Sequence, residues 1–180
     1  MSFAEILDEP LLAELYSYWT ERSRGRKVPT RADIDPVDIP QLLPHLTLTE
    51  MVPAQTARGF RIRYRLAGTE IESHFGCPLT NRYLDDLVTG PFVDFAMELH
   101  ERVRTEKEPI YTEVLFGSDE AEALYAKRLM LPLSEDGQTV NLMLAGVLFF
   151  NRNPSARKTI LHSHKQFSST AVHTPRCSFS

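Results

Sequence analysis

The chain has 180 residues, of which 42% are hydrophobic and 24% are charged, a composition that suits one ordinary globular domain. The formal net charge is −4. Residues 151–180 contain five basic and no acidic residues and carry +5, so residues 1–150, with 15 basic and 24 acidic residues, carry −9. A body this acidic is poorly suited to phosphate backbones, and no nucleic acid is expected as a partner. The longest apolar run has nine residues, 142–150, whereas a membrane-spanning helix needs roughly 20, so no membrane partner is expected either.

The two cysteines, Cys77 and Cys177, lie 100 residues apart and form no CxxC pair. This spacing indicates neither a disulfide framework nor a zinc knuckle. Reduced thiols are typical of the cytoplasm. The amino terminus also lacks the basic flank and apolar run of a signal peptide, so we predict a cytoplasmic protein.

The first predicted helix covers residues 8–25. Asp8 can cap it and Pro10 falls in its first turn, while leucine and aromatic residues recur at helical spacing from Leu11 to Trp19. Its apolar side would pack on a sheet face or on the same helix of a second subunit. Residues 29–44 contain four prolines and predict a rigid connector with a short helix that Asp35 caps.

Two strands are predicted next, at residues 45–52 and 60–67. Leu46 and Leu48 alternate with threonines in the first, and three arginines alternate with apolar residues in the second. The polar connection of hairpin length between them predicts antiparallel neighbours.

A compact turn and a short helix follow Gly68. Thr69 and Glu72 have the spacing of a capping box at a helix start. Gly76 is expected to end that helix in the left-handed conformation, and Pro78 keeps it from resuming.

A longer helix is predicted from residue 89 to about 103, with Phe92, Phe95, Ala96, Leu99 and Val103 on one face. Three strands then follow at residues 110–116, 124–133 and 140–150. This order, with helices after the second strand, predicts an α+β fold with an antiparallel sheet. Residues 151–180 show almost no periodic pattern and predict a mobile basic tail.

The strings WTERSRGRKVPTRADIDPVDIPQLLPHLTL and FRIRYRLAGTEIESHFGCPLTNR, together with this element order, resemble a bacterial PAS-like family that was first listed as a domain of unknown function. The resemblance covers residues 11–147. Its most specific residues lie in three groups, which are Pro29, Arg31, Asp33, Asp35 and Pro36, then Tyr64, Arg65, Gly68 and Thr69, and then Phe75, Gly76, Leu79, Thr80 and Arg82. Asn81 stands where the family pattern has Gly, and Asn is the next best residue at positive φ.

The resemblance implies a PAS-like five-stranded antiparallel sheet, with short helices and one longer helix over a pocket on one face. It also implies that the helix at the amino terminus flanks this domain and serves in homodimer formation. We therefore divide the chain into a flanking helix at residues 1–28, a PAS-like domain at 29–150 and the tail at 151–180.

The resemblance also implies that the pocket holds haem, flavin, a small metabolite or nothing. A haem would need a histidine in the pocket, either His74 or His100, and a lone histidine is weak support. His100 lies one position off the apolar stripe, which favours a surface role. Cys77 lies in FGCPLT, unlike a flavin attachment motif, and is better explained as a small semi-buried side chain.

The three arginines of the second strand would form an anion site or pair with the acids of the connector, Asp33, Asp35 and Asp38. We favour pairing, with Arg65, Gly68 and Thr69 as structural anchors. The histidines of the tail and Cys177 lack zinc-site spacing, so no metal site is predicted. No nucleophile with a base, paired carboxylates or phosphate loop stands out, so no catalytic residue is predicted.

The first hypothesis is therefore a non-enzymatic sensory module that binds a small-molecule ligand. It would form a homodimer through its N-terminal helix and act on an unidentified signalling partner. Two alternatives remain, a small cone-shaped α+β enzyme of the isomerase or dehydratase type, or a purely structural interaction module. The enzyme would need an Asp, His or Tyr with a shifted pKa in its cavity. The predicted pocket wall comprises Leu48, Ile62, Tyr64, Phe75, Phe95, Leu99 and Met130.

Overall fold

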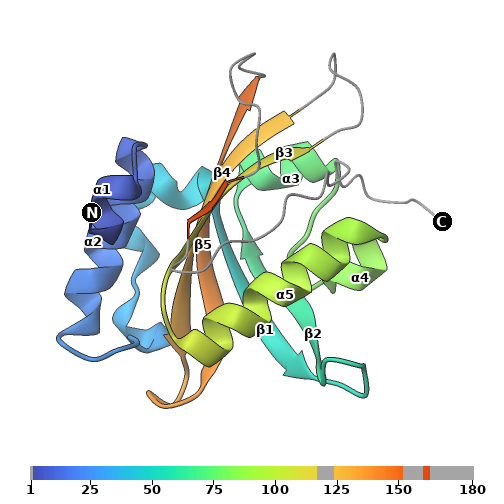
Figure 1. Ribbon diagram of the computed structural model, residues 1–180, viewed down its shortest axis with the longest axis horizontal. Helices are drawn as coiled ribbons and strands as arrows, with labels where there is room; N and C mark the ends of the chain where they lie inside the picture. Colours follow the sequence, from blue (N-terminus) through green and yellow to red (C-terminus); the bar gives the residue numbers. More distant parts are fainter. Residues whose placement is uncertain (1, 117–123, 152–159, 163–180) are drawn as a thin grey trace.

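The computed structural model describes residues 2–116, 124–151 and 160–162. The fold is α+β and is built around one antiparallel sheet in the order β2-β1-β5-β4-β3-β6 (Figure 1). The first five strands confirm the predicted sheet, and their bounds lie close to the predicted ranges. The strands are β1 (Leu46–Pro53), β2 (Phe60–Ala67), β3 (Ile110–Phe116), β4 (Leu124–Ser134), β5 (Val140–Asn151) and β6 (Ile160–His162).

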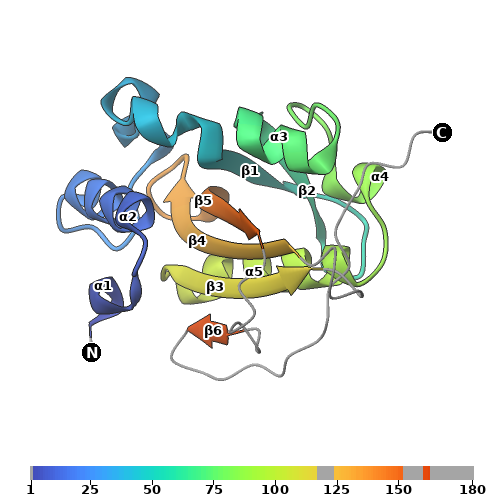
Figure 2. The ribbon, with the colours of Figure 1, turned by 90° about the horizontal axis from the view of Figure 1, so that it is seen from above.

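Helices cover both faces of the sheet. The three helices inserted between β2 and β3 lie on one face, and α1 and α2 lie on the other (Figures 1 and 2). Each face therefore has its own buried apolar cluster. The helices are α1 (Phe3–Ile6), α2 (Pro10–Ser23), α3 (Thr69–Phe75), α4 (Leu84–Leu87) and α5 (Pro91–Glu106), with short 3-10 helices η1 (Arg31–Asp33), η2 (Pro36–Asp38) and η3 (Pro40–His45).

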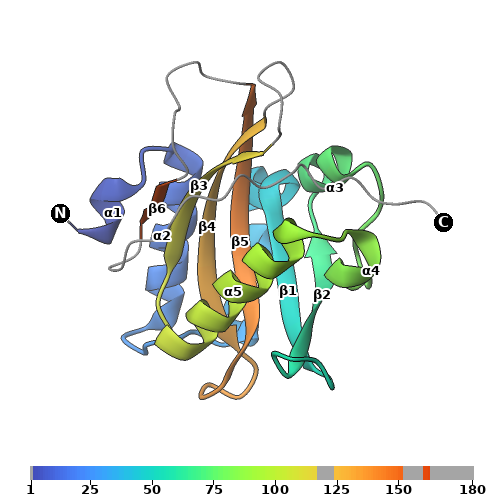
Figure 3. The same ribbon diagram turned by 45° about the vertical axis from the view of Figure 1, so that its right-hand side comes forward.

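The long helix α5 crosses the face of the sheet diagonally (Figure 3). Its predicted apolar stripe is confirmed for Phe92, Ala96, Leu99 and Val103, which are buried, whereas Phe95 is only partly buried. These side chains pack against strand residues of the same cluster. This layer of helix over a curved sheet creates the interior described below.

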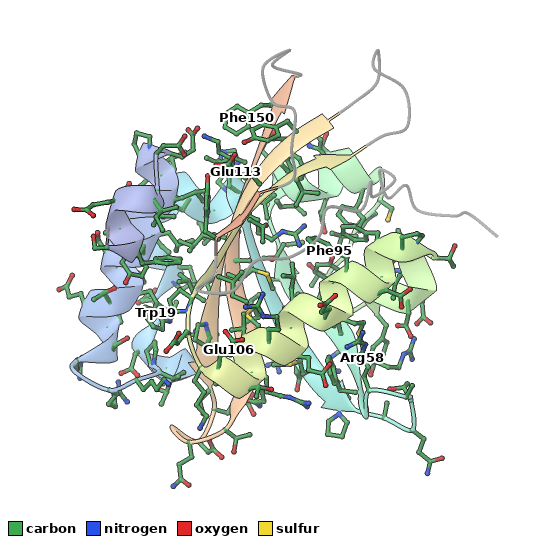
Figure 4. All side chains as sticks on the ribbon, in the orientation of Figure 1. Trp19, Arg58, Phe95, Glu106, Glu113 and Phe150 are labelled. Atoms are coloured by element: carbon green, nitrogen blue, oxygen red, sulfur yellow. The ribbon has the colours of Figure 1, made fainter. Side chains whose placement is uncertain are left out.

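The helix α2 packs its apolar side on the opposite face of its own sheet. Leu12, Leu15 and Trp19 are buried there, and the Trp19 indole donates a hydrogen bond of 2.9 Å to the Pro132 carbonyl (Figure 4). Asp8 does not cap the helix, contrary to the prediction, because its carboxylate pairs with the Lys127 ammonium of β4. The N-terminal helix is thus a second cover for the sheet.

The turn after β2 brings two chain segments into very close approach. A Cβ at Gly68 would lie 2.2 Å from the carbonyl oxygens of Leu43 and Pro44 in η3, so no larger residue fits without moving the backbone. The predicted capping box is wrong, because Gly68 is the N-cap of α3 and the Thr69 side chain makes no cap hydrogen bond. The Glu72 carboxylate instead accepts a hydrogen bond of 2.8 Å from the Leu79 backbone. The Thr69 side chain therefore has no capping role, and its part as a structural anchor stays a prediction.

Two predictions about positive φ are confirmed in the next loop. Gly76 ends α3 with φ 75°, and Asn81 has φ 65°. The Asn81 backbone N–H donates a hydrogen bond of 2.7 Å to the Tyr64 carbonyl, and the Tyr64 backbone N–H donates one of 2.9 Å to the Arg82 carbonyl. This loop therefore fixes the backbone of Tyr64 in β2.

The predicted tail lies mostly outside the described residues. Within it, β5 extends to Asn151, and residues 160–162 form β6, which pairs with the edge of β3 (Figure 2). A sixth strand was not predicted.

Candidate functional site

A small cavity lies between the sheet and the helices α3, α4 and α5. Its volume is about 40 Å³. Since one water molecule needs roughly 10–15 Å³ by this measure, the cavity has room for about three. Its wall comes from strands β1, β2, β4 and β5 and from the three helices, and comprises Thr47, Thr49, Ile62, Tyr64, Ile71, Phe75, Leu84, Phe92, Ala96, His100, Arg128, Met130, Met143, Ala145, Val147 and Phe149.

Of the seven predicted pocket residues, four lie in the cavity wall, two lie beside it and one, Leu48, lies on the other face of the sheet. Ile62, Tyr64, Phe75 and Met130 lie in the cavity wall. Leu99 is buried in the same apolar cluster and Phe95 packs against it, but neither is part of the wall.

The placement of Leu48 in the pocket is wrong. Leu48 and Leu46 belong to the cluster under α2, whereas Thr47 and Thr49 line the cavity. The prediction assumed that the leucine side of this strand faces the pocket. Because both faces of the sheet are covered, the apolar side of β1 packs under α2 and its threonine side faces the cavity.

His100 is buried at 6% exposure, so the predicted surface role is wrong. Its Nδ1 lies 2.7 Å from the Ala96 carbonyl and its Nε2 lies 2.8 Å from the Thr49 hydroxyl. A carbonyl oxygen only accepts, so Nδ1 carries the proton and Nε2 accepts from Thr49. Burial lowers the pKa of His100 to about 4, which keeps the imidazole neutral near pH 7.

Tyr64 projects from β2 into the same cavity. Burial raises the pKa of its phenol to about 12, so the hydroxyl remains protonated and can donate a hydrogen bond. The ring packs edge-on against Phe75 at 6.3 Å between centroids. Its hydroxyl has no hydrogen-bond partner among the described residues, which leaves it available to a bound molecule.

Arg128 of β4 was not predicted as a site residue. In β4 it alternates with Ala126 and Met130, both of which lie in the cluster on the cavity side, and it is itself part of the wall. Burial lowers the pKa of its guanidinium. A cation at a core-facing position of a buried strand was the signal that could have identified it.

The three arginines of β2 pair, as predicted, although not with the predicted acids. Arg61 binds Asp85 and Asp86, while Arg63 and Arg65 share Glu50 of β1. Arg65 is the weaker partner of Glu50, at 3.3 Å against 2.5 Å for Arg63. The role of Arg65 as a structural anchor stays a prediction.

The other two residues considered for cofactor binding, His74 and Cys77, are not part of the cavity wall. His74 stacks on Phe149 with 3.8 Å between ring centroids, and its Nδ1 lies 2.8 Å from the Glu70 carbonyl. Cys77 is 5% exposed, but it is disulfide-bonded, contrary to the expectation of reduced thiols. Cys177 lies outside the described residues.

The cavity fits neither a haem nor a flavin in this conformation, because about 40 Å³ leaves no room for their ring systems. Nor does the described part of the chain contain a group of three or more His, Cys, Asp or Glu residues that could hold a metal ion. The groups that face the interior can instead donate hydrogen bonds and supply positive charge.

A curved antiparallel sheet with helices inserted after its second strand, enclosing a small interior cavity, is the architecture of a PAS-like domain. A family model described as PAS domain matches residues 7–149, which is most of the chain. The chain therefore belongs to the PAS domain family, and the resemblance of its sequence is confirmed. No curated protein matches the chain. PAS domains act generally as non-enzymatic sensory and interaction modules. No helix among the described segments is long and apolar enough to cross a membrane.

Proposed function

We propose that this PAS domain is a non-enzymatic sensor that binds a small molecule in its cavity and transmits the bound state through α2 to a homodimeric or other protein partner. The observation that carries the proposal is the convergence of Tyr64 and Arg128 with the His100–Thr49 pair on one apolar cavity. A few polar groups in a mostly apolar pocket are typical of small-molecule sites.

The sheet itself offers a route from the cavity to α2. In β5, Met143 and Ala145 face the cavity, whereas Gly146 lies against α2. A Cβ at Gly146 would lie 2.8 Å from the Leu15 side chain and 2.9 Å from that of Leu12, so α2 sits almost on the strand backbone. A ligand that displaces β5 would therefore also displace α2, because packed interfaces do not deform continuously.

The homodimer through the N-terminal helix belongs to the same proposal. Because the apolar side of α2 is covered by its own sheet, pairing would use the opposite side, where Ser17 is exposed. Ser17→Arg should convert a dimer to a monomer in light scattering after size exclusion. Gln55→Arg, which adds the same charge in the exposed loop before β2, should leave the mass unchanged.

The enzyme alternative draws some support from the buried His100 and Tyr64. However, both nitrogens of His100 are already hydrogen-bonded, to Ala96 and Thr49, and no Asp or Glu lies in the described cavity wall. A hydroxyl that donates to an imidazole has the geometry of a nucleophile beside its base, but a pKa of about 4 makes the His100 imidazole a weak base near pH 7. We therefore favour the sensor.

Native mass spectrometry of the purified protein, with an absorbance spectrum, tests the proposal. A non-covalent added mass, or a mass shift on incubation with a metabolite mixture, is the expected result. A protein that neither carries nor acquires any small molecule would favour the purely structural interaction module.

A further inference from the structure

Arg128 is a half-buried cation in the cavity wall that lacks, among the described residues, the acidic partner such a group normally has. No described residue forms an ion pair or a hydrogen bond with its guanidinium, whereas Arg61 and Arg63 on the solvent side of the same sheet are both paired with acids. Arg128 stands between Ala126 and Met130 on the cavity side of β4, with Val147 of β5 beside it. A charge that is partly removed from water and has no counter-ion is costly, so such groups are usually paired.

The surroundings of Arg128 supply no counter-charge. The described wall of the cavity includes no Asp or Glu. Tyr64 adds a hydroxyl without a partner among the described residues. Thr112, directly opposite Arg128 on β3, has a fully buried hydroxyl that also lacks a partner in the described structure. One cation and two hydrogen-bond donors without acceptors therefore gather in one part of the interior.

We propose that the cavity binds a small carboxylate anion, with the carboxylate held by the Arg128 guanidinium and the Tyr64 hydroxyl and a short alkyl part lying among the apolar side chains. This inference rests on the proposed ligand-binding function and names its ligand class. The planar guanidinium presents two parallel N–H groups that match a carboxylate.

The size and the lining of the cavity narrow the ligand further. Space for about three water molecules corresponds to roughly four to six non-hydrogen atoms, the size range of acetate, propionate and butyrate. Apart from Thr47, Thr49 and His100, the rest of the wall, which includes Ile62, Phe92 and Met143, is apolar and suits alkyl groups. Both methionines of the wall, Met130 and Met143, have flexible side chains that can adapt to an alkyl chain of varying length.

The test compares Arg128→Met with the wild-type protein by isothermal titration of sodium acetate, propionate and butyrate. Met keeps much of the side-chain length and removes the charge. We expect the wild type to bind at least one of the three anions, and Arg128→Met to bind it about 10- to 100-fold more weakly, the fold-change typical of losing hydrogen bonds to a charged group. Arg61→Met, which removes one paired cation on the opposite side of β2, should bind like the wild type.

Two further measurements separate binding from stability. Propionamide, which has the shape of propionate without its charge, should not compete. The melting temperature of Arg128→Met without ligand should equal or exceed that of the wild type, because the substitution removes an unpaired, partly desolvated charge from the cavity wall. A purely structural arginine would give a lower melting temperature.

Equal affinity of wild type and Arg128→Met, equal binding of propionamide, or no binding of any of the three carboxylates would overturn the inference. These outcomes are distinct from failure of the proposed function. A neutral molecule found by native mass spectrometry would leave the sensor in place and refute only its anionic ligand.

Discussion

The buried His100 makes the stability of the domain depend on pH in a defined window. The folded pKa of His100 is about 4, below the ordinary value of 6.5, because burial disfavours the imidazolium. As the pH falls, the unfolded chain takes up the proton first. Stability is therefore complete above pH 6.5 and is lost progressively until the pH reaches about 4.

The size of the effect follows from the two pKa values. A difference of 2.5 pKa units corresponds to about 3 kcal/mol over the whole window, at about 1.4 kcal/mol per unit. Between pH 7.5 and pH 5 the loss is about 2 kcal/mol, because one proton is then bound almost entirely by the unfolded chain. A domain of this size should lose roughly 4–8 °C in melting temperature over that step.

The assay is urea unfolding and thermal melting at several pH values between 7.5 and 5, for the wild type and for His100→Gln. The glutamine cannot titrate but can still bond both Thr49 and the Ala96 carbonyl, so it should remove most of the pH dependence in this window. His74→Gln, on the half-exposed histidine of α3, is the matched control and should retain the wild-type slope. NMR titration of the His100 ring in the folded protein gives the same pKa directly. A His100 that titrates near pH 6.5, or a His100→Gln variant with an unchanged slope, would refute the reasoning.

Two substitutions test the turn and the arginine cluster after β2. Gly68→Ala places a Cβ against backbone oxygens 2.2 Å away, so we expect a loss of about 3 kcal/mol or more and a melting temperature at least about 6 °C lower. The neighbouring Thr69→Ala removes a hydroxyl that caps nothing and should change the melting temperature by less than about 2 °C, and equal effects of the two would contradict the close approach. Arg65→Ala should cost less than about 1 kcal/mol in urea unfolding, because its side chain is 40% exposed and Glu50 keeps its shorter bond to Arg63. A loss above about 2 kcal/mol would show that Arg65 is the main anchor after all.

The architecture could be predicted from the sequence because its signals are local. Alternation of residue types defines the strands, and the spacing of Phe92, Leu99 and Val103 defines the buried side of α5. The positive φ of Gly76 and Asn81 follows from the few residue types that tolerate it. Each of these features depends on residues close together in the chain.

The cavity could be predicted only in part, because which face of a strand lines it depends on distant elements. Leu48 was assigned to the pocket by its hydrophobicity, yet α2 supplies a second apolar cover on the far face of the sheet. His100 lies beside the apolar stripe and next to Glu101, so its position suggested solvent. Its burial depends on the Thr49 hydroxyl, a partner 51 residues earlier in the chain.

The ion-pair partners of the charged side chains could not be predicted from the sequence either. Arg61 was expected to bind the acids of the connector, and it binds those of α4. The connector acids Asp33 and Asp38 pair instead with Arg26 and Arg22, near the end of α2. The sequence indicates that an acidic chain will pair its arginines, while the fold decides which acids are near.

The same contrast separates Arg128 from the other arginines of the chain. An arginine on the solvent side of a strand can pair with acids on neighbouring strands and loops, as Arg63 and Arg65 pair with Glu50. An arginine that faces the interior has only the side chains of the wall as partners, and here these carry no described acid. Its desolvation therefore opposes folding without any gain from pairing. A position that weakens the folded domain yet would strengthen a complex with an anion fits the proposed ligand binding better than packing, since an apolar side chain would serve packing better.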